Sequence, residues 1–176
     1  MTARKEFKIA VTKDNLVFAS AHFITFPGHR CETLHGHNYR TRVVVEGGLD
    51  PEAHYVLDFA ELKRLMKRLV DEIDHKVLLP LQNPKVAVRE EGEAVTVAVC
   101  GKPAYRFPKA DCALLPVPNT TVEMLAQYLA GRLCRELAAA GGAGGAGGAG
   151  GAALRAVEVE VEENFGQSAT YRESFE

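Results

Sequence analysis

Residues 38–48 read Asn-Tyr-Arg-Thr-Arg-Val-Val-Val-Glu-Gly-Gly, and this stretch decides the fold class. From Tyr39 to Val45 every second residue is aromatic or β-branched, and the residues between them are mostly charged. Residues two apart on a strand project to the same face, so the pattern predicts a strand from Asn38 to Glu46 with one buried face. The glycine pair that follows is a turn signal and ends the strand.

Strand patterns also occur towards both ends of the chain. Residues 7–23 interleave large apolar residues with polar ones, which predicts a long strand or a hairpin arm with a turn-like Lys13-Asp14-Asn15. Valine alternates with glutamate over residues 157–162, and a last strand is expected to end near Tyr171. We expect the strands at 7–23 and 38–46 to be antiparallel neighbours.

Two helices are predicted from their start signals and their apolar spacing. Asp58 and Glu61 have the spacing of a capping box, and Thr120 and Glu123 repeat it further along the chain. Apolar residues then recur at helical intervals after each start. Those expected to face the core are Phe59, Leu62, Leu65, Met66, Leu69 and Ile73 in the first helix, and Met124, Leu125, Tyr128, Leu129, Leu133 and Leu137 in the second.

The order of these elements is strands, helix, hairpin, helix, strands. This grouping favours an α+β fold, with two helices on one face of an antiparallel sheet, over a doubly wound parallel sheet. We expect one domain over residues 1–176, which is an ordinary domain size. Two segments are interpreted as insertions in it: a β-hairpin at about 85–112, built on the valine-rich runs of residues 86–99 and ended by residues 100–103, and a flexible Gly-Gly-Ala linker at 141–152.

Composition argues against several classes of function. A formal net charge of -2 provides no overall basic field, so we expect no nucleic-acid partner. No stretch approaches the roughly 20 apolar residues of a membrane span, and the first residues lack the apolar core of a signal peptide. We therefore expect no membrane partner and a cytoplasmic location. The 4 cysteines have no CxxC spacing and are expected to be free thiols.

Three histidines are the candidate metal ligands. His35 and His37 open the strand that continues to Glu46, and side chains two apart on a strand project to the same side. His22 ends the preceding strand, and it stands beside that pair if the two strands pair across the loop of residues 24–34. Three neutral imidazoles suit Zn²⁺ and leave a fourth position for water or substrate, as in catalytic zinc sites.

Cys31 leaves two alternatives open at this site. As a fourth ligand it would close the coordination shell and make the zinc site a structural one. As a free side chain near the metal it would be a general base, because a neighbouring cation lowers the pKa of a thiol from about 8.5 and makes thiolate available near neutral pH. Only geometry distinguishes these two roles.

Motifs in a fixed order cover nearly the whole chain outside the two insertions. They are Phe18-Ala-Ser-Ala-His22, Cys31-Glu-Thr-Leu-His-Gly-His-Asn-Tyr39, Leu57-Asp-Phe-Ala-Glu-Leu-Lys63, Ile73-Asp-His75, Thr121-Val-Glu-Met-Leu-Ala126, Glu163 and Tyr171. In this combination the chain resembles the 6-pyruvoyl and 6-carboxytetrahydropterin synthases. The resemblance implies a tunnelling fold (T-fold), in which subunits join their sheets into a barrel, usually a homo-oligomer of two stacked trimers with active sites between subunits.

The resemblance also implies a role for each site residue. His22, His35 and His37 would hold Zn²⁺, and Cys31 would be the catalytic base. The remaining residues are Asp74 and His75, which would relay a proton in the site of a neighbouring subunit, Glu163, which would anchor the pterin ring, and Thr121, whose backbone would contact the pterin.

Two of these roles compete with simpler interpretations. Asp74 and His75 at a helix end are also typical of a capping arrangement. Glu163 follows three exposed-face glutamates, but strict alternation places it on the valine face, where a carboxylate needs a partner. This break in the pattern favours a ligand-binding role for Glu163.

The substrate implied by the resemblance is 7,8-dihydroneopterin triphosphate. Cysteine four residues before His-Gly-His is similar to the bacterial carboxypterin enzymes, so we expect 6-carboxy-5,6,7,8-tetrahydropterin, acetaldehyde and triphosphate as products. One alternative is 6-pyruvoyltetrahydropterin, formed by triphosphate elimination. Another is retro-aldol cleavage of dihydroneopterin, for which some relatives carry glutamate in place of the cysteine; here Glu32 follows Cys31. A hypothesis of another class is a zinc-stabilised pterin-binding protein without turnover.

Overall fold

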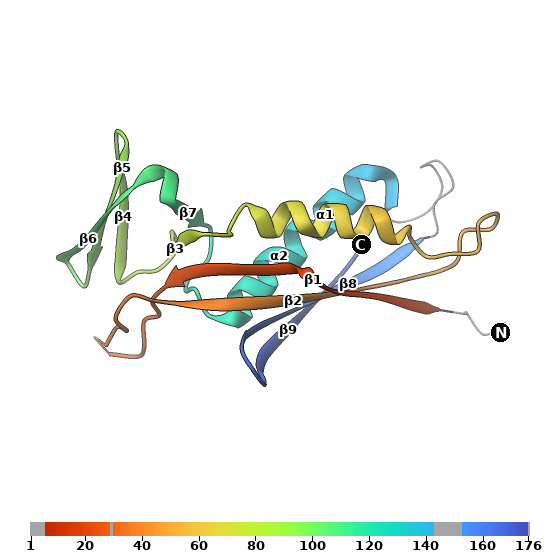
Figure 1. Ribbon diagram of the computed structural model, residues 1–176, viewed down its shortest axis with the longest axis horizontal. Helices are drawn as coiled ribbons and strands as arrows, with labels where there is room; N and C mark the ends of the chain where they lie inside the picture. Colours follow the sequence, from red (N-terminus) through yellow and green to blue (C-terminus); the bar gives the residue numbers. More distant parts are fainter. Residues whose placement is uncertain (1–5, 29, 143–152, 176) are drawn as a thin grey trace.

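The computed structural model describes residues 6–28, 30–142 and 153–175. In these residues a six-stranded sheet carries two long helices on one face, and a three-stranded sheet lies at one end of it (Figure 1). The elements are β1 (Phe7–His22), β2 (His35–Gly47), α1 (Phe59–Asp71), β3 (Lys76–Pro80), β4 (Val86–Glu91), β5 (Ala94–Val99), β6 (Lys102–Pro108), β7 (Cys112–Leu115), α2 (Val122–Leu137), β8 (Leu154–Asn164) and β9 (Gln167–Ser174).

The strand order of the large sheet is β7-β3-β1-β2-β8-β9. Its centre is antiparallel, since β1 pairs with β2, β2 with β8 and β8 with β9 in that sense. The sheet as a whole is mixed, because β3 pairs parallel to β1 and β7 parallel to β3. Helix α1 runs back along the sheet from the end of β2, so that β3 runs in the same direction as β1 (Figure 1). The α+β fold with two helices on one face is confirmed, and the two parallel strands extend its antiparallel part.

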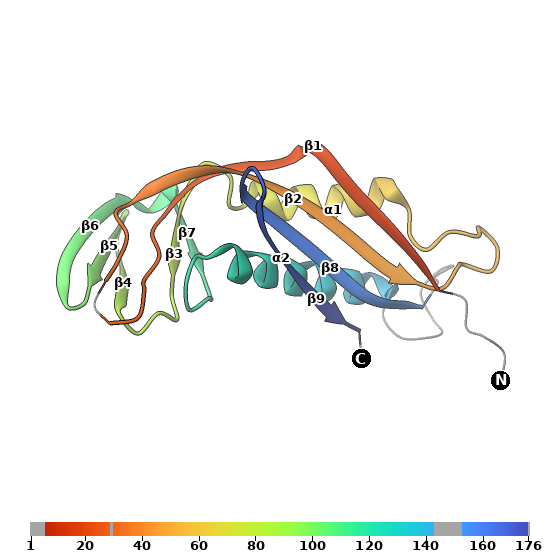
Figure 2. The same ribbon diagram turned by 90° about the horizontal axis from the view of Figure 1, so that it is seen from below.

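β1 is one continuous strand, with an irregularity at the residues whose sequence is turn-like. Its register with β2 shifts between Thr12 and Val17, and Thr41 of β2 closes the gap by donating its hydroxyl hydrogen to the Leu16 carbonyl at 2.8 Å. Extra residues on one strand of an antiparallel pair bend that strand without ending it. β1 bends in its middle accordingly (Figure 2). The turn-like Lys13-Asp14-Asn15 is therefore a bulge within a strand.

The main core lies between the large sheet and the two helices. The Asp58 carboxylate accepts a hydrogen bond from the Ala60 N–H at 2.7 Å and caps α1, as predicted, but the Glu61 half of the predicted capping box is not seen, because the Glu61 carboxylate accepts hydrogen bonds from Arg64 instead. The apolar face of β2 is buried as expected. Buried core residues include Tyr39, Val43 and Val45 of β2, Leu62, Leu65, Met66 and Leu69 of α1, Leu125, Leu129, Leu133 and Leu137 of α2, and Val157, Val159 and Val161 of β8.

The second helix starts differently from the expectation. Its N-cap is Thr121, which makes no side-chain capping bond, so the predicted capping box of Thr120 and Glu123 does not form. The Thr120 side chain is fully buried and donates its hydroxyl hydrogen to the Phe23 carbonyl at 2.9 Å. The Thr120 hydroxyl group therefore makes a tertiary contact and does not cap the helix in the way that the local pattern predicted.

The insertion forms three strands, not the two of a hairpin. β4 and β5 are the predicted pair, but Cys100 and Gly101, with φ of 50° and 78°, make a tight turn that leads into β6. Pro103 does not end the sheet, because β6 is an edge strand and needs fewer backbone donors. The predicted end at residues 100–103 was therefore wrong.

Two further sequence predictions concern the rest of the chain. The Gly-Gly-Ala linker predicted at 141–152 lies almost wholly outside the described residues, and only Gly141 and Gly142 belong to a described element, the π-helical turn Ala138–Gly142. Among the residues that the structure describes, no helix is long and apolar enough to cross a membrane.

Candidate metal centre

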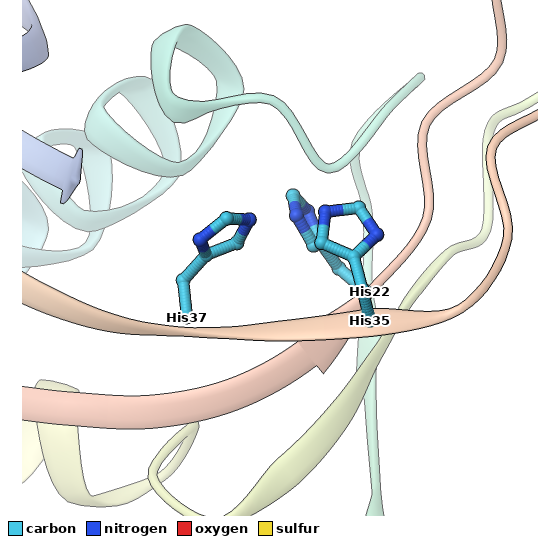
Figure 3. Close-up of side chains that lie close together, drawn as sticks. All are labelled: His22, His35 and His37. Carbon is cyan, nitrogen blue, oxygen red and sulfur yellow. The ribbon is translucent and has the colours of Figure 1, made fainter.

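Three histidine rings meet at the ends of β1 and β2. His22 is paired directly with His35 in the register of the two strands, and His37 lies two residues further along β2. One ring nitrogen from each lies within 4.8 Å of the others. Figure 3 shows the three rings on the same side of the two strands. The structure therefore brings together the three histidines that the sequence singled out.

Backbone carbonyls set the orientation of two of these rings. His22 Nδ1 lies 2.8 Å from the Thr120 carbonyl oxygen, and His35 Nδ1 lies 2.8 Å from that of Thr33. A carbonyl only accepts hydrogen bonds, so Nδ1 carries the proton in both rings and the Nε2 lone pair remains free. This tautomer is the one in which a histidine binds a metal through Nε2.

His22 Nε2 supplies the observation that tests the fit of a metal ion. This atom is buried and has no hydrogen-bond partner among the described residues, although the Glu163 carboxylate is 3.3 Å away. Burial lowers the pKa of His22, which keeps its imidazole neutral. A neutral, buried nitrogen without a donor is costly unless an ion occupies its lone pair. The three histidines therefore could hold a metal ion.

Glu163 lies at the edge of the histidine group. Its Oε1 is 3.3 Å from His22 Nε2 and 3.7 Å from His37 Nε2, and it accepts a hydrogen bond from the Tyr39 hydroxyl at 3.4 Å. Burial and the neighbouring Glu163 raise the pKa of Tyr39, so its hydroxyl stays a neutral donor. The carboxylate has polar partners on the valine face of β8, as the break in alternation predicted.

Cys31 lies in the loop between β1 and β2, outside the ligand group. It is half-buried and pairs with Thr25 in an isolated antiparallel bridge. Burial, followed by the neighbouring Cys100 and Glu32, raises the pKa of the Cys31 thiol. To act as a base at neutral pH, the Cys31 thiol needs a lowered pKa. The positive charge of a bound cation would lower it.

Asp74 and His75 form a close pair between α1 and β3. Asp74 Oδ1 is 2.9 Å from His75 Nδ1 and accepts the Ala19 N–H at 2.8 Å, and the His75 N–H donates to the Ala19 carbonyl at 2.7 Å. Against the effect of burial, the hydrogen bonds from Ala19 and His75 hold the pKa of Asp74 below its usual value.

The position of this pair differs from that of the histidine group. The His75 side chain is 81% exposed and lines a hollow of about 480 Å³ together with Ala19 and Asn38. Ala19 and Asn38 alternate along their strands with residues that face the histidine side, so they project to the opposite face of the sheet. His37 also borders this hollow, but the His75 ring is not part of the group of three histidine nitrogens that could hold a metal ion.

Sequence reasoning missed one group that lies beside the histidines. The Thr120 carbonyl orients His22, and a backbone contact of this kind has no sequence signal. The Glu32 carboxylate, which the retro-aldol alternative singled out, lies 3.9 Å from His35 Nε2. Thr121, the predicted pterin contact, follows Thr120 directly and is the N-cap of α2.

The sequence profile described as 6-pyruvoyl tetrahydropterin synthase matches residues 10–174, almost the entire chain. The protein belongs to the 6-pyruvoyl tetrahydropterin synthase family. A putative 6-carboxy-5,6,7,8-tetrahydropterin synthase of Methanocaldococcus jannaschii is 33% identical over 161 residues, which are 92% of each chain. The 6-carboxy-5,6,7,8-tetrahydropterin synthase of Aquifex aeolicus is 30% identical over 146 residues, or 80% of each.

Solved structures of this synthase family have the same fold. The crystal structure of 6-pyruvoyl tetrahydropterin synthase from Plasmodium vivax matches with a TM-score of 0.82 at 26% identity, covering 98% of this chain and 100% of that one. Two further Plasmodium vivax structures, with the same TM-score of 0.82, are of variants in which a catalytic glutamate is substituted. The protein is thus a tetrahydropterin synthase family enzyme.

Proposed function

We propose that this protein converts 7,8-dihydroneopterin triphosphate and water to 6-carboxy-5,6,7,8-tetrahydropterin, acetaldehyde and triphosphate. Relatives that match over most of their length and carry this product in their names, among them those of Methanocaldococcus jannaschii and Aquifex aeolicus, support the assignment. The structural observation that carries it is the group of three histidines in which buried His22 Nε2 has no hydrogen-bond partner among the described residues.

Zn²⁺ is the proposed ion, held by His22, His35 and His37. Three neutral imidazole ligands suit zinc, and a site of three protein ligands keeps a position for substrate. The chemistry that Zn²⁺ supplies in such a site is Lewis-acid polarisation of an oxygen ligand, which makes the adjacent C–H bond more acidic. Zinc is preferred over harder cations because the ligand group contains nitrogen and no carboxylate.

The protein's own groups then have separate tasks. Cys31, as thiolate, takes a proton from the carbon next to the bound side-chain oxygen of the substrate. Glu163, as carboxylate, accepts hydrogen bonds from the guanidine-like edge of the pterin ring. The Thr121 backbone, at the start of α2, contacts the same ring. Glu163 Oε1 lies within 3.7 Å of His22 Nε2 and of His37 Nε2. This closeness supports a substrate that contacts both Glu163 and the ion held by the histidines.

His75 is proposed to serve the site of a neighbouring subunit. Its ring is oriented by Asp74, is 81% exposed and lines an open hollow, so it is available to a second chain. This arrangement agrees with a homo-oligomer in which sites lie between subunits, as in a hexamer of two stacked trimers. In that assembly His75 relays a proton on the side of the substrate opposite Cys31.

Glu32 favours a second candidate function, retro-aldol cleavage of the dihydroneopterin side chain. Its carboxylate is 3.9 Å from His35 Nε2, where it can act as a base beside the metal in addition to Cys31. The glutamate named catalytic in the Plasmodium vivax synthase supports this role. A dihydroneopterin monophosphate aldolase of Pyrococcus furiosus is 39% identical over 61 residues, which cover 35% of this chain. Formation of 6-pyruvoyltetrahydropterin at the same site is the remaining alternative.

The test is incubation of zinc-loaded protein with 7,8-dihydroneopterin triphosphate and resolution of the products by mass spectrometry. We expect 6-carboxytetrahydropterin and acetaldehyde, lost in Cys31→Ala and in His35→Ala. A 6-hydroxymethyl pterin that disappears in Glu32→Gln would instead establish cleavage, and 6-pyruvoyltetrahydropterin would establish triphosphate elimination. No turnover by folded, zinc-loaded protein would refute all three and favour a pterin-binding protein.

A further inference from the structure

The loop of residues 23–34, which we call the Cys31 loop, is held in a defined shape at its base. The Glu32 N–H donates to the Ile24 carbonyl at 2.9 Å, and Thr25 pairs with Cys31 in an antiparallel bridge. Nearer the tip, the Phe26 N–H donates to the Arg30 carbonyl at 3.0 Å. The position of Cys31 is thus set through its partner Thr25.

Asn119 clamps Thr25 from outside the loop. Its Oδ1 accepts the Thr25 N–H at 3.3 Å, and its Nδ2 donates to the Thr25 carbonyl at 3.1 Å. One side-chain amide therefore binds both backbone groups of Thr25, as a neighbouring strand would. The same Oδ1 accepts the Thr120 N–H at 3.1 Å, and the Thr120 carbonyl orients His22. Asn119 thus links the residue paired with Cys31 to the residue that orients a proposed metal ligand.

Asn83 also holds Thr25, through the threonine side chain. It is 7% exposed, and its Nδ2 donates to the Thr25 hydroxyl oxygen at 2.9 Å and to the Pro118 carbonyl at 2.7 Å. Its Oδ1 accepts the Lys85 N–H at 2.9 Å. The amide of Asn83 therefore joins the Cys31 loop, the segment before α2 and the start of the inserted sheet.

The inserted sheet β4–β6 packs against the Cys31 loop. The Lys85 ammonium group donates to the Phe26 carbonyl at 2.5 Å, and the Lys85 carbonyl accepts the Cys100 N–H at 2.8 Å. Phe23 is buried in one apolar cluster with Leu79, Val86, Val95 and Val97, against which Cys31 and Leu34 also pack. Both views place the loop and this sheet at the same end of the molecule (Figures 1 and 2).

We propose that Asn119, together with Asn83, is a positioning residue that holds Cys31 at a fixed place relative to the metal ligands, with the inserted sheet as its support. This inference rests on the proposed function of Cys31 as a base. A proton-transfer group has to lie within hydrogen-bond reach of its substrate, and a displacement of about 1 Å can cost roughly 100-fold in rate. A loop clamped at Thr25 by two amides meets that demand.

The test compares Asn119→Ala and Asn83→Ala with the wild type as full-length, zinc-loaded protein. We expect kcat to fall about 10- to 100-fold while KM changes by less than about threefold, because neither asparagine contacts Glu163, the proposed anchor of the ring. Zinc content stays at the wild-type level in Asn83→Ala, which removes contacts to Thr25, Pro118 and Lys85 and none to Thr120. The rate at which iodoacetamide alkylates Cys31, followed by mass spectrometry of its peptide, rises several-fold as the loop loosens.

Thr96→Ala is the matched control. It removes a 3.1 Å hydrogen bond from Thr96 to Glu91 inside the inserted sheet without touching the Cys31 loop, so kcat and the alkylation rate should stay at the wild-type level. Asn119→Asp keeps an acceptor for the Thr25 and Thr120 N–H groups but places a carboxylate oxygen against the Thr25 carbonyl, so its kcat should fall and its alkylation rate rise at least as far as in Asn119→Ala. If Asn119→Ala does not fold, the ordering of Asn119→Asp and Asn83→Ala against the wild type decides the question.

Two results would overturn the proposal. One is a kcat within about twofold of the wild type in folded Asn119→Ala and Asn83→Ala, whatever the alkylation rate. The other is a lowered kcat with an unchanged alkylation rate of Cys31, since the loss would then come from another part of the site. Failure of the proposed function is recognised separately, because wild-type protein would then show no turnover while the alkylation rates still report on the loop.

Discussion

The Thr120 carbonyl oxygen lies 2.8 Å from His22 Nδ1, so the segment that enters α2 sets the ring of a histidine at the end of β1. These residues are 98 positions apart in sequence. The contact leaves His22 Nε2 with a free lone pair that faces His35 and His37. The metal centre therefore depends on the packing of α2 against the sheet as well as on the strand pair that carries its ligands.

Removal of one histidine should remove the metal. We expect His22→Ala to weaken Zn²⁺ binding by more than about 100-fold, because loss of a ligand is at least as costly as loss of an outer-shell partner. Isothermal titration with Zn²⁺ and metal analysis after dialysis measure this. His54→Ala is the matched control, since His54 is exposed and lies outside the ligand group. Stoichiometric zinc in His22→Ala would contradict the ligand assignment.

Zinc should change the titration of Cys31. In metal-free protein, burial raises the pKa of this thiol, so alkylation by iodoacetamide should need a pH above the ordinary range of a cysteine. A bound cation nearby favours thiolate, so the midpoint of the rate against pH should move to lower pH when Zn²⁺ is added. Cys112, whose pKa is also raised by burial, should not respond. If zinc protected Cys31 from alkylation at every pH, the thiol would be a fourth ligand and the site a closed structural one.

Glu163 should affect substrate binding more than the chemical step. Glu163→Gln loses a charge-assisted hydrogen bond to the pterin, worth about 1.5–3 kcal/mol, so we expect KM to rise by about 10- to 100-fold with a smaller change in kcat. Steady-state kinetics give both constants. Glu162→Gln is the control, because that neighbour pairs with Arg40 at 3.9 Å and accepts the Gly166 N–H at 2.9 Å, away from the histidine group, and glutamine keeps an oxygen for the second contact. A wild-type KM in Glu163→Gln would exclude the anchoring role.

Glu46 should make stability depend on pH in the acid range. Hydrogen bonds from Arg172 and Lys8 lower its pKa to about 2 in the folded protein. A lowered folded-state pKa contributes stability that is present above the ordinary value near 4.5 and is lost as the pH falls towards 2. We expect Glu46→Gln to reduce the free energy of unfolding by about 1–2 kcal/mol at pH 7.

Urea unfolding at several pH values between 7 and 2 tests this expectation. The difference between Glu46→Gln and the wild type should shrink as the pH falls through the acid range. Glu160→Gln weakens a 3.9 Å pair with Arg42 and keeps an oxygen that can accept the Ser168 hydroxyl at 2.8 Å, so it should have a smaller effect at every pH. A constant difference across the range would show that Glu46 stabilises the sheet by packing and not by its charge.

The buried faces of strands and helices could be predicted from short repeats in the sequence. The alternation from Tyr39 to Val45 identified the buried face of β2, and the apolar spacing after Asp58 identified α1. The same two-residue repeat placed His35 and His37 on one side of a strand and Glu163 on the valine face. Such predictions succeed because a strand or helix turns its side chains at a fixed period, whatever lies around it.

The roles of residues that depend on contacts distant in sequence could not be predicted. Thr120 has the sequence of a cap, but a buried contact with Phe23 takes its hydroxyl, and its carbonyl holds His22. Pro103 looked like the end of a hairpin, and an edge position allowed a third strand to continue through it.

The sequence by itself determined the two-helix α+β fold and the placement of His35 and His37 on one face of a strand, because both follow from local spacing. His22 was added to them through the expected pairing of the two strands, which the structure confirms. Only the tertiary structure decided that Cys31 lies outside the ligand group, that the His75 ring is exposed and held by Asp74 outside that group, and that two asparagines clamp the Cys31 loop. The physical reason is that these relationships come from hydrogen bonds and packing between segments far apart in the chain, which no local repeat encodes.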